Sequence, residues 1–141
     1  MKSFHIITFG CQMNEHDSER MTGILEAQGC ASTDDALAAD MVILNTCSIR
    51  EKAEQKFFSE LGRLQKLKDE RPGLTIAVAG CIAQQEGARI LSRAPYVDIV
   101  FGPSDIARLP AMVERKRTHA GPLVDTSGDA EYHRKNRPAS R

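Results

Sequence analysis

The chain has 141 residues, the length of one domain, and its 19 Lys and Arg balance 19 Asp and Glu, so the whole chain has no signature of polyanion binding. From Glu114 onward, seven basic against four acidic side chains leave a net charge of +3, which is more typical of a solvated tail than of a nucleic-acid site. The N-terminus shows no apolar signal segment and no run approaches the roughly 18 apolar residues of a membrane span, which indicates a cytoplasmic protein without membrane contact.

Apolar runs alternate with helical patterns from the start of the chain. Residues 4–9 predict a strand that is rich in β-branched and aromatic residues. A helix follows, and we expect Asn14 to cap it, Asp17 and Glu19 to lie in its first turn, and Gly29 to end it.

The same alternation continues through the middle of the chain. Residues 33–40 predict a turn with a short helical piece, and residues 41–44 predict a strand whose unbroken hydrophobicity suits burial on both faces. Ser48 and Glu51 form a capping-box pattern at the start of a long helix that Arg71-Pro72-Gly73 ends. Its apolar stripe repeats at steps of three and four and consists of Ala53, Phe57, Leu61, Leu64 and Leu67.

The remaining predicted strands cover residues 74–79, 96–101 and, as a short edge strand, 123–125. Helices are predicted over residues 84–93 and over a segment capped by Ser104 or Asp105. The alternation predicts an α/β fold: an open parallel sheet of about four to five strands with helices on both faces, in a flavodoxin- or Rossmann-like three-layer sandwich. We assign residues 1–117 to this domain and residues 118–141 to a linker.

Three of the four cysteines occupy equivalent positions. Cys11, Cys47 and Cys81 each follow a predicted strand and precede a helix, so they fall at the carboxyl edge where open α/β sheets bind ligands. In a flavodoxin-like order the first strand lies between the second and third, which would make the three loops neighbours. Gly10 and Gly80 directly precede two of the cysteines and are expected to leave room for a bulky ligand. Three soft thiolates at one edge predict a soft metal or an iron–sulfur cluster.

The other candidate residues have plainer interpretations. Cys30 follows a helix stop and is expected to pack as a small hydrophobe. His5 lies within a strand as a structural histidine, and His16 is expected on the exposed face of its helix. No C-x-x-C, G-x-G-x-x-G or P-loop pattern occurs, which counts against thioredoxin-like redox chemistry and nucleotide binding.

Three segments resemble the N-terminal domain of the tRNA methylthiotransferases, which are radical S-adenosylmethionine enzymes. They are residues 8–14 (TFGCQMN) with 17–19 (DSE), residues 45–53 (NTCSIREKA) and residues 80–84 (GCIAQ). The first segment is most similar to the branch that acts on isopentenyladenosine next to the anticodon.

The resemblance implies that Cys11, Cys47 and Cys81 ligate an auxiliary 4Fe–4S cluster with one open iron, which serves as the sulfur carrier. It also implies a transferase whose S-adenosylmethionine and second 4Fe–4S cluster bind a C-x-x-x-C-x-x-C motif in a following domain, and this sequence lacks that motif. The chain alone is therefore expected to be inactive, and no catalytic side chain is assigned within it.

Two other hypotheses stay open. One is a non-catalytic, zinc- or metal-binding regulatory module that uses the same cysteines, and the other is a flavodoxin-like domain with three inert thiols. We expect a monomer whose tRNA partner is bound by the full-length enzyme and bound weakly or not at all by this chain. The basic residues beyond the predicted core, toward that missing part, are Arg115, Lys116, Arg117, Arg134, Lys135 and Arg137.

Overall fold

The computed structural model describes residues 3–9, 12–46, 51–80, 87, 89–116 and 123–125. Within them, six strands form one sheet in the order β2-β1-β3-β4-β5-β6, and every neighbouring pair is parallel. The strands are β1 (Ser3–Phe9), β2 (Ala31–Ser32), β3 (Met41–Thr46), β4 (Thr75–Ala79), β5 (Ile99–Phe101) and β6 (Leu123–Asp125). This sheet confirms the predicted open parallel α/β architecture, and its order is the flavodoxin-like one.

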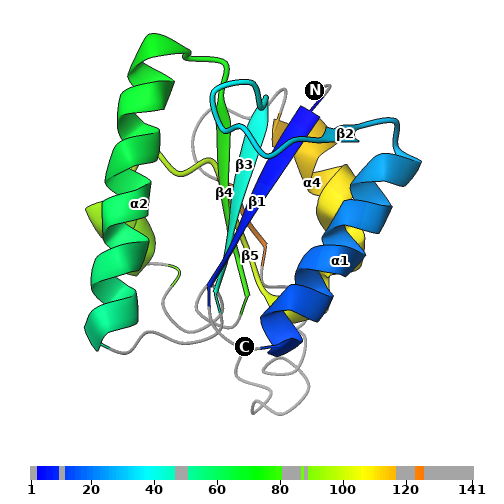
Figure 1. Ribbon diagram of the computed structural model, residues 1–141, viewed down its shortest axis with the longest axis horizontal. Helices are drawn as coiled ribbons and strands as arrows, with labels where there is room; N and C mark the ends of the chain where they lie inside the picture. Colours follow the sequence, from blue (N-terminus) through cyan, green and yellow to red (C-terminus); the bar gives the residue numbers. More distant parts are fainter. Residues whose placement is uncertain are drawn as a thin grey trace, which may run out of the picture.

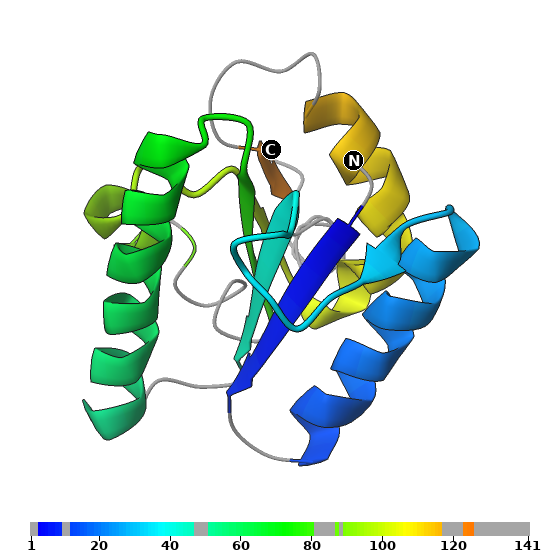
Figure 2. The ribbon, with the colours of Figure 1, turned by 45° about the horizontal axis from the view of Figure 1, so that its top comes forward.

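The helices cover both faces of the sheet, as Figures 1 and 2 show. On one face lie α1 (Gln12–Ala27), the 3-10 helix η1 (Pro103–Arg108) and α4 (Leu109–Lys116), and α1 contacts both of the others. On the opposite face lie α2 (Glu51–Glu70) and the helical residues 89–93. The predicted three layers are therefore present.

The core is divided by the alternation of side chains along the central strand. Val42 and Leu44 pack on the α2 side with Phe57, Leu61 and Leu64 of α2. Met41 and Ile43 pack on the opposite side, where Met21 and Leu25 of α1 meet them. Because β3 is buried on both faces, its hydrophobicity is continuous rather than alternating.

The position of the first strand differs from the prediction. We expected the first strand, at residues 4–9, to lie between the strands predicted at residues 41–44 and 74–79. In the structure β3 lies between β1 and β4 instead. The difference arises from β2, a strand of two exposed residues that the sequence pattern did not reveal. It takes the outer place beside β1, so the flavodoxin-like order holds with β2 as its second strand.

Several element ends also differ. Helix α1 begins at Gln12, so Asn14 lies inside it rather than at its cap, and Glu15 rather than Asp17 or Glu19 is the acidic residue of its first turn. Several polar residues follow β1, and each of them could begin a helix, so composition alone did not locate the first turn of α1. The capping box expected at Ser48 lies outside the described residues.

Residues 33–40 form turns without the expected helical piece. The Asp35 carboxylate accepts a hydrogen bond from the Leu37 backbone N–H at 2.9 Å, a local bond that competes with helix formation.

β5 and η1 also differ from the prediction. β5 begins at Ile99 rather than at residue 96. The 3-10 helix η1 is capped by Gly102 without a side-chain bond, so neither Ser104 nor Asp105 is the cap. The predicted edge strand at residues 123–125 is confirmed as β6, which lies within the range predicted as linker.

Candidate metal centre at the carboxyl edge of the sheet

The three strands that precede Cys11, Cys47 and Cys81 in the sequence are direct neighbours in the sheet. Phe9 of β1 is in register with Thr46 of β3, and Asn45 of β3 is in register with Ala79 of β4. The three strands therefore end together at one edge. Cys11, Cys47 and Cys81 follow these ends in the sequence by one or two residues and lie outside the described residues.

The point between β1 and β3 is where the connections change direction. After β1 the chain enters α1 on one face, and after β3 it enters α2 on the other face (Figures 1 and 2). In open α/β sheets, ligands bind outside the carboxyl ends of the strands at such a switch point. The loops that carry Cys11 and Cys47 flank this position in the sequence.

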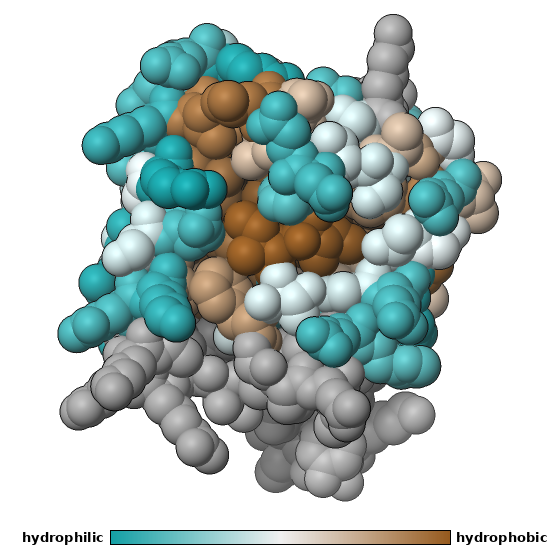
Figure 3. All heavy atoms as spheres, viewed as in Figure 1, coloured by the Kyte–Doolittle hydropathy of each residue, from teal (hydrophilic) through white to brown (hydrophobic). Residues whose placement is uncertain are grey.

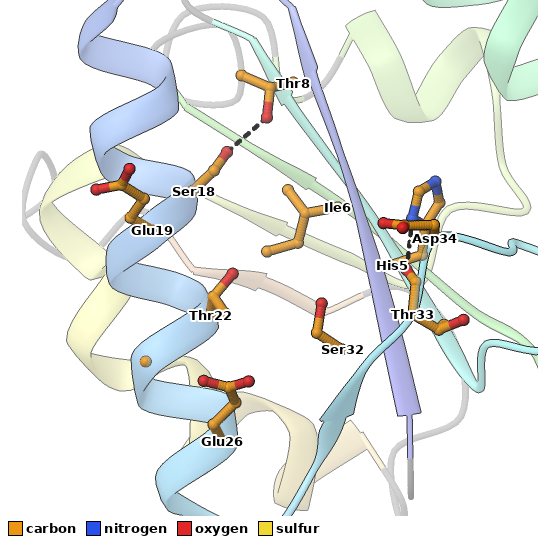
Figure 4. A pocket seen from close by; sticks show the side chains of 11 residues that line it. His5, Ile6, Thr8, Ser18, Glu19, Thr22, Glu26, Ser32, Thr33 and Asp34 are labelled. Carbon is orange, nitrogen blue, oxygen red and sulfur yellow. Dashed lines mark hydrogen bonds between the residues drawn. The ribbon is translucent and has the colours of Figure 1, made fainter.

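A polar network joins the strand ends on the α1 side of this edge. The Asn45 side-chain amide donates a hydrogen bond to Ser18 Oγ at 3.0 Å, and Ser18 Oγ lies 2.8 Å from Thr8 Oγ1. Figure 4 shows the Thr8–Ser18 bond between β1 and α1. Asn45 is 1% exposed, so its polar groups depend on partners within the protein.

Gly80 joins the third strand end to the other two. Its φ is +104°, and a Cβ placed there would lie 2.1 Å from the Thr46 carbonyl oxygen and 3.0 Å from Asn45 Oδ1. We expected this glycine to leave room for a ligand. The space is instead taken by the end of β3, so β4 and β3 approach each other more closely than any side chain would allow.

A polar groove runs beside the network, between α1 and the β1–β2 edge (Figure 4). It has a volume of about 380 Å³, and its lining includes the carboxylates Glu19, Glu26 and Asp34. Ser18 and Thr22 point from successive turns of α1 toward β1, and Glu26 lies one turn further along the helix (Figure 4). Because three carboxylates line this groove, it is unsuited to phosphate groups.

A second groove, of about 600 Å³, lies where the end of β1 meets α2. Phe9 lines it together with Lys56 and Arg63, and the Phe9 ring packs edge-on against Phe57 at a centroid distance of 6.2 Å. On the face seen in Figure 3, apolar side chains gather in the middle, over β1 and β3, beside the hydrophilic side chains of α2.

The remaining candidate residues lie where the sequence indicated. Cys30 is half-buried and packs against the core on the α1 side, as expected of a small hydrophobe. His5 Nδ1 lies 2.9 Å from the Thr33 carbonyl oxygen, which can only accept, so the histidine donates this bond and is structural. His16 is exposed. Among the described side chains, no three His, Cys, Asp or Glu residues come together as a metal site requires.

The sequence pattern alone does not reveal that Thr8, Ser18 and Asn45 form a network. The available signal was Asn45 itself, because a carboxamide directly follows the four apolar residues that begin this strand. A buried polar residue in such a position requires partners.

The fold and this edge define a doubly wound α/β domain with a cysteine-bearing loop after each of three adjacent strands. The chain belongs to the uncharacterized protein family UPF0004, whose model matches residues 3–102. This match covers most of the sheet and the three cysteine positions.

The chain is also similar to curated proteins that carry a functional name. The chain is 54% identical over 127 residues to tRNA-2-methylthio-N(6)-dimethylallyladenosine synthase of Burkholderia ambifaria (strain MC40-6), an alignment of 89% of this chain and 28% of the relative. It is 53% identical over 127 residues to the protein of the same name from Burkholderia lata, again with 89% and 28% covered. The resemblance to the tRNA methylthiotransferases is thereby confirmed.

The chain spans little more than a quarter of the length of these curated relatives. No helix among the described residues is long and apolar enough to cross a membrane.

Proposed function

We propose that the chain is the cluster-binding domain of a tRNA methylthiotransferase that acts on isopentenyladenosine next to the anticodon. In this proposal Cys11, Cys47 and Cys81 hold an auxiliary 4Fe–4S cluster. The remainder of the enzyme, for which the longer relatives provide the precedent, supplies S-adenosylmethionine, a second cluster and most of the tRNA contacts.

The observation that carries the proposal is the adjacency of β1, β3 and β4 at one edge of the sheet. Consecutive Cα atoms are about 3.8 Å apart, so chain connectivity holds each cysteine within about 8 Å of its strand end. Neighbouring strands are separated by about 4.8 Å, so three such cysteines are within reach of one another. A fold that scattered these strands would contradict the proposal.

The donor set fits the proposed group. Thiolates are the ligands that iron–sulfur clusters prefer, and structural zinc usually takes four protein ligands rather than three. When bound, a cluster with one iron free of protein ligands would supply the sulfur for transfer. The chain's own part is to hold three thiolates in fixed positions and to shield the edge from water.

The helices that follow the strands support thiolate rather than thiol at two of the positions. α1 begins at Gln12, directly after Cys11, and runs for 16 residues, while α2 follows Cys47 by a few residues and runs for 20. The N-terminus of a long helix favours negative charge, so it favours the thiolate form.

Anaerobic reconstitution with iron and sulfide tests the proposal. We expect a brown protein with about four irons and four sulfides per chain. A colourless protein that takes up stoichiometric zinc and no sulfide would support the regulatory zinc module, and a protein that binds neither would support three inert thiols.

Activity provides a second test. We expect the isolated chain to be inactive toward tRNA even with its cluster in place, because the proposed radical chemistry requires the rest of the enzyme. Methylthiolation of an isopentenylated anticodon stem-loop by this chain alone would show that it does not need the rest of the enzyme.

A further inference from the structure

Resting on the proposed cluster site, we infer that Asn45 and Ser18 are positioning residues that hold the cysteine loops after β1 and β3 at a fixed separation. Thr8 completes their network, and the contact of Gly80 with β3 extends the same restraint to the loop after β4. None of these residues needs to touch the cluster, because they act through the strand ends and helix start that carry the cysteines.

The network spans both sides of the first cysteine loop. Thr8 stands three residues before Cys11 on β1, and Ser18 stands seven residues after it on α1. Their hydroxyl groups are 2.8 Å apart, so the strand and the helix that border the loop are joined directly.

The bond from Asn45 carries this restraint to β3. Asn45 is in register with Thr8 on one side and with Ala79 on the other, and it stands two residues before Cys47. Its amide donates to Ser18 at 3.0 Å, so a displacement of α1 relative to β3 must break a bond of a group that is 1% exposed. An unsatisfied buried amide is costly, so the network favours one arrangement of the two strand ends.

The third loop is tied to the same place by contact rather than by a hydrogen bond. The absence of a side chain at Gly80 lets the end of β4 lie directly against Thr46 and the Asn45 side chain. Asn45 and Thr46 therefore lie against the ends of both flanking strands, β1 and β4.

The composition of β3 argues against a purely structural role for the amide. Met41, Val42, Ile43 and Leu44 are all apolar and fully buried, so the interior of the sheet is stabilised without polar groups. A single carboxamide at the ligand-facing end of such a strand adds little to burial, but it specifies one geometry where an apolar residue would allow several.

The test uses Ser18→Ala, which removes the central hydroxyl from a half-buried position on α1. Thr22→Ala is the matched control, because Thr22 lies one turn further along the same helix and lines the same groove. Ser18→Thr keeps the hydroxyl and should restore the cluster lifetime. Thr8→Val removes only the bond between Thr8 and Ser18. Each protein is reconstituted anaerobically, and its rate of iron loss to a chelator, the EPR spectrum of the reduced cluster and the melting temperature of the apo form are measured.

We expect Ser18→Ala to lose iron severalfold faster than the unaltered chain and to give a broadened EPR signal, with Thr8→Val intermediate and Thr22→Ala and Ser18→Thr unchanged. The apo form of Ser18→Ala should also melt at a lower temperature, because the Asn45 amide loses this acceptor. Asp98→Ala, just before β5 at the amino edge of the sheet, is therefore the stability control: it should lower the apo melting temperature and leave the cluster lifetime and spectrum unaltered, which separates positioning from general stability. If Ser18→Ala holds its cluster with unaltered lifetime and spectrum, or if Thr22→Ala behaves in the same way as Ser18→Ala, the inference is wrong while the proposed function stands. If the unaltered chain takes up no cluster, the proposed function fails and the inference fails with it.

Discussion

Two residues at the carboxyl edge of the sheet, Asn45 and Gly80, show how tightly the ends of β3 and β4 are packed. One is a buried amide that is bound to α1, and the other is a glycine whose φ of +104° and contact with the Thr46 carbonyl leave no space for a Cβ. Side-chain identity at these positions is therefore set by contacts between elements that lie far apart in the sequence.

Gly80→Ala should destabilise the apo protein by about 2 kcal/mol or more, because it combines a left-handed backbone conformation with a clash against a carbonyl oxygen. Gly62→Ala is the control, since Gly62 lies in α2 with nothing within 4 Å of its added Cβ. This control should stabilise the protein by up to about 1 kcal/mol through helix propensity. Denaturant unfolding of both variants measures the difference, and equal stabilities would show that the edge can relax.

The cysteines give the second prediction for single residues. Cys11→Ala, Cys47→Ala and Cys81→Ala should each abolish stable cluster binding, whereas Cys30→Ala should retain it. Cys30 packs against the core at the end of α1, away from the ends of β1, β3 and β4. Iron and sulfide analysis after reconstitution decides the matter. Iron lost from the Cys30 variant but kept in one of the other three would identify a different ligand set.

At the level of secondary-structure elements, the Asp98 carboxylate joins the amino ends of β4 and β5 to two helices. Asp98, just before β5, accepts a hydrogen bond from the Ile76 backbone N–H at 2.9 Å and forms ion pairs with Lys68 at the end of α2 and Lys116 at the end of α4. The Asp98 backbone N–H also donates to the Ile76 carbonyl oxygen, at 2.8 Å. Tyr96 lies in a turn and the Val97 N–H donates back to the Ala94 carbonyl oxygen at 3.1 Å, so β5 starts at Ile99 rather than at residue 96.

Asp98→Ala should cost about 2–3 kcal/mol of the free energy of unfolding, since it leaves two lysines and a backbone N–H near the sheet without their acceptor. The Asp98 side chain is 15% exposed, which keeps the estimate below that of a fully buried pair. Arg20→Ala is the matched control, because Arg20 is 49% exposed and lies 3.9 Å from Asp17 in a loose pair at the surface of α1. Its loss should cost less than about 1 kcal/mol, and urea unfolding compares the two. Equal effects would mean that Asp98 is only a surface charge.

For the molecule as a whole, the two-sided core predicts a protein that folds without metal. Both faces of the sheet carry continuous apolar clusters, and residues such as Phe4, Phe57 and Phe101 are almost completely buried. A small zinc domain depends on its metal because it lacks such a core. The metal-free chain should therefore unfold cooperatively on heating, as followed by circular dichroism. A gradual transition without a midpoint would contradict this.

The second prediction for the whole molecule concerns RNA. The net charge is zero, and affinity from counterion release grows with the number of phosphates that a protein neutralises. Lys116, which sequence analysis grouped with residues beyond the core, lies 3.7 Å from Asp98 in an ion pair, so it is not simply available to a phosphate. The isolated chain should bind an anticodon stem-loop weakly or not at all.

Fluorescence anisotropy at about 150 mM salt, where charges are screened beyond roughly 8 Å, measures this binding. Sub-micromolar, stem-loop-specific affinity of this chain alone would show that the domain carries its own RNA site.

The succession of strands and helices followed from the sequence because a sheet covered on both faces requires long apolar runs, and these runs end at recognisable breaks. The helix stop at Gly29, the stripe of α2 from Phe57 to Leu67 and the short edge strand β6 were all confirmed in this way. The cysteine positions at three strand ends were also visible, although their geometry stays a prediction. The division between residues 1–117 and 118–141 likewise stays a prediction.

What required the tertiary structure were the contacts between distant segments. β2 is two exposed residues without a hydrophobic pattern, and it is a strand only because Ala31 and Ser32 pair with Ser3 and Phe4 of β1. Because β2 occupies the outer side of β1, β3 rather than β1 lies in the middle of the three strands that a cysteine follows. The bond from Asn45 to Ser18 and the packing of Gly80 on Thr46 arise in the same way, since they join residues that only the folded sheet brings together.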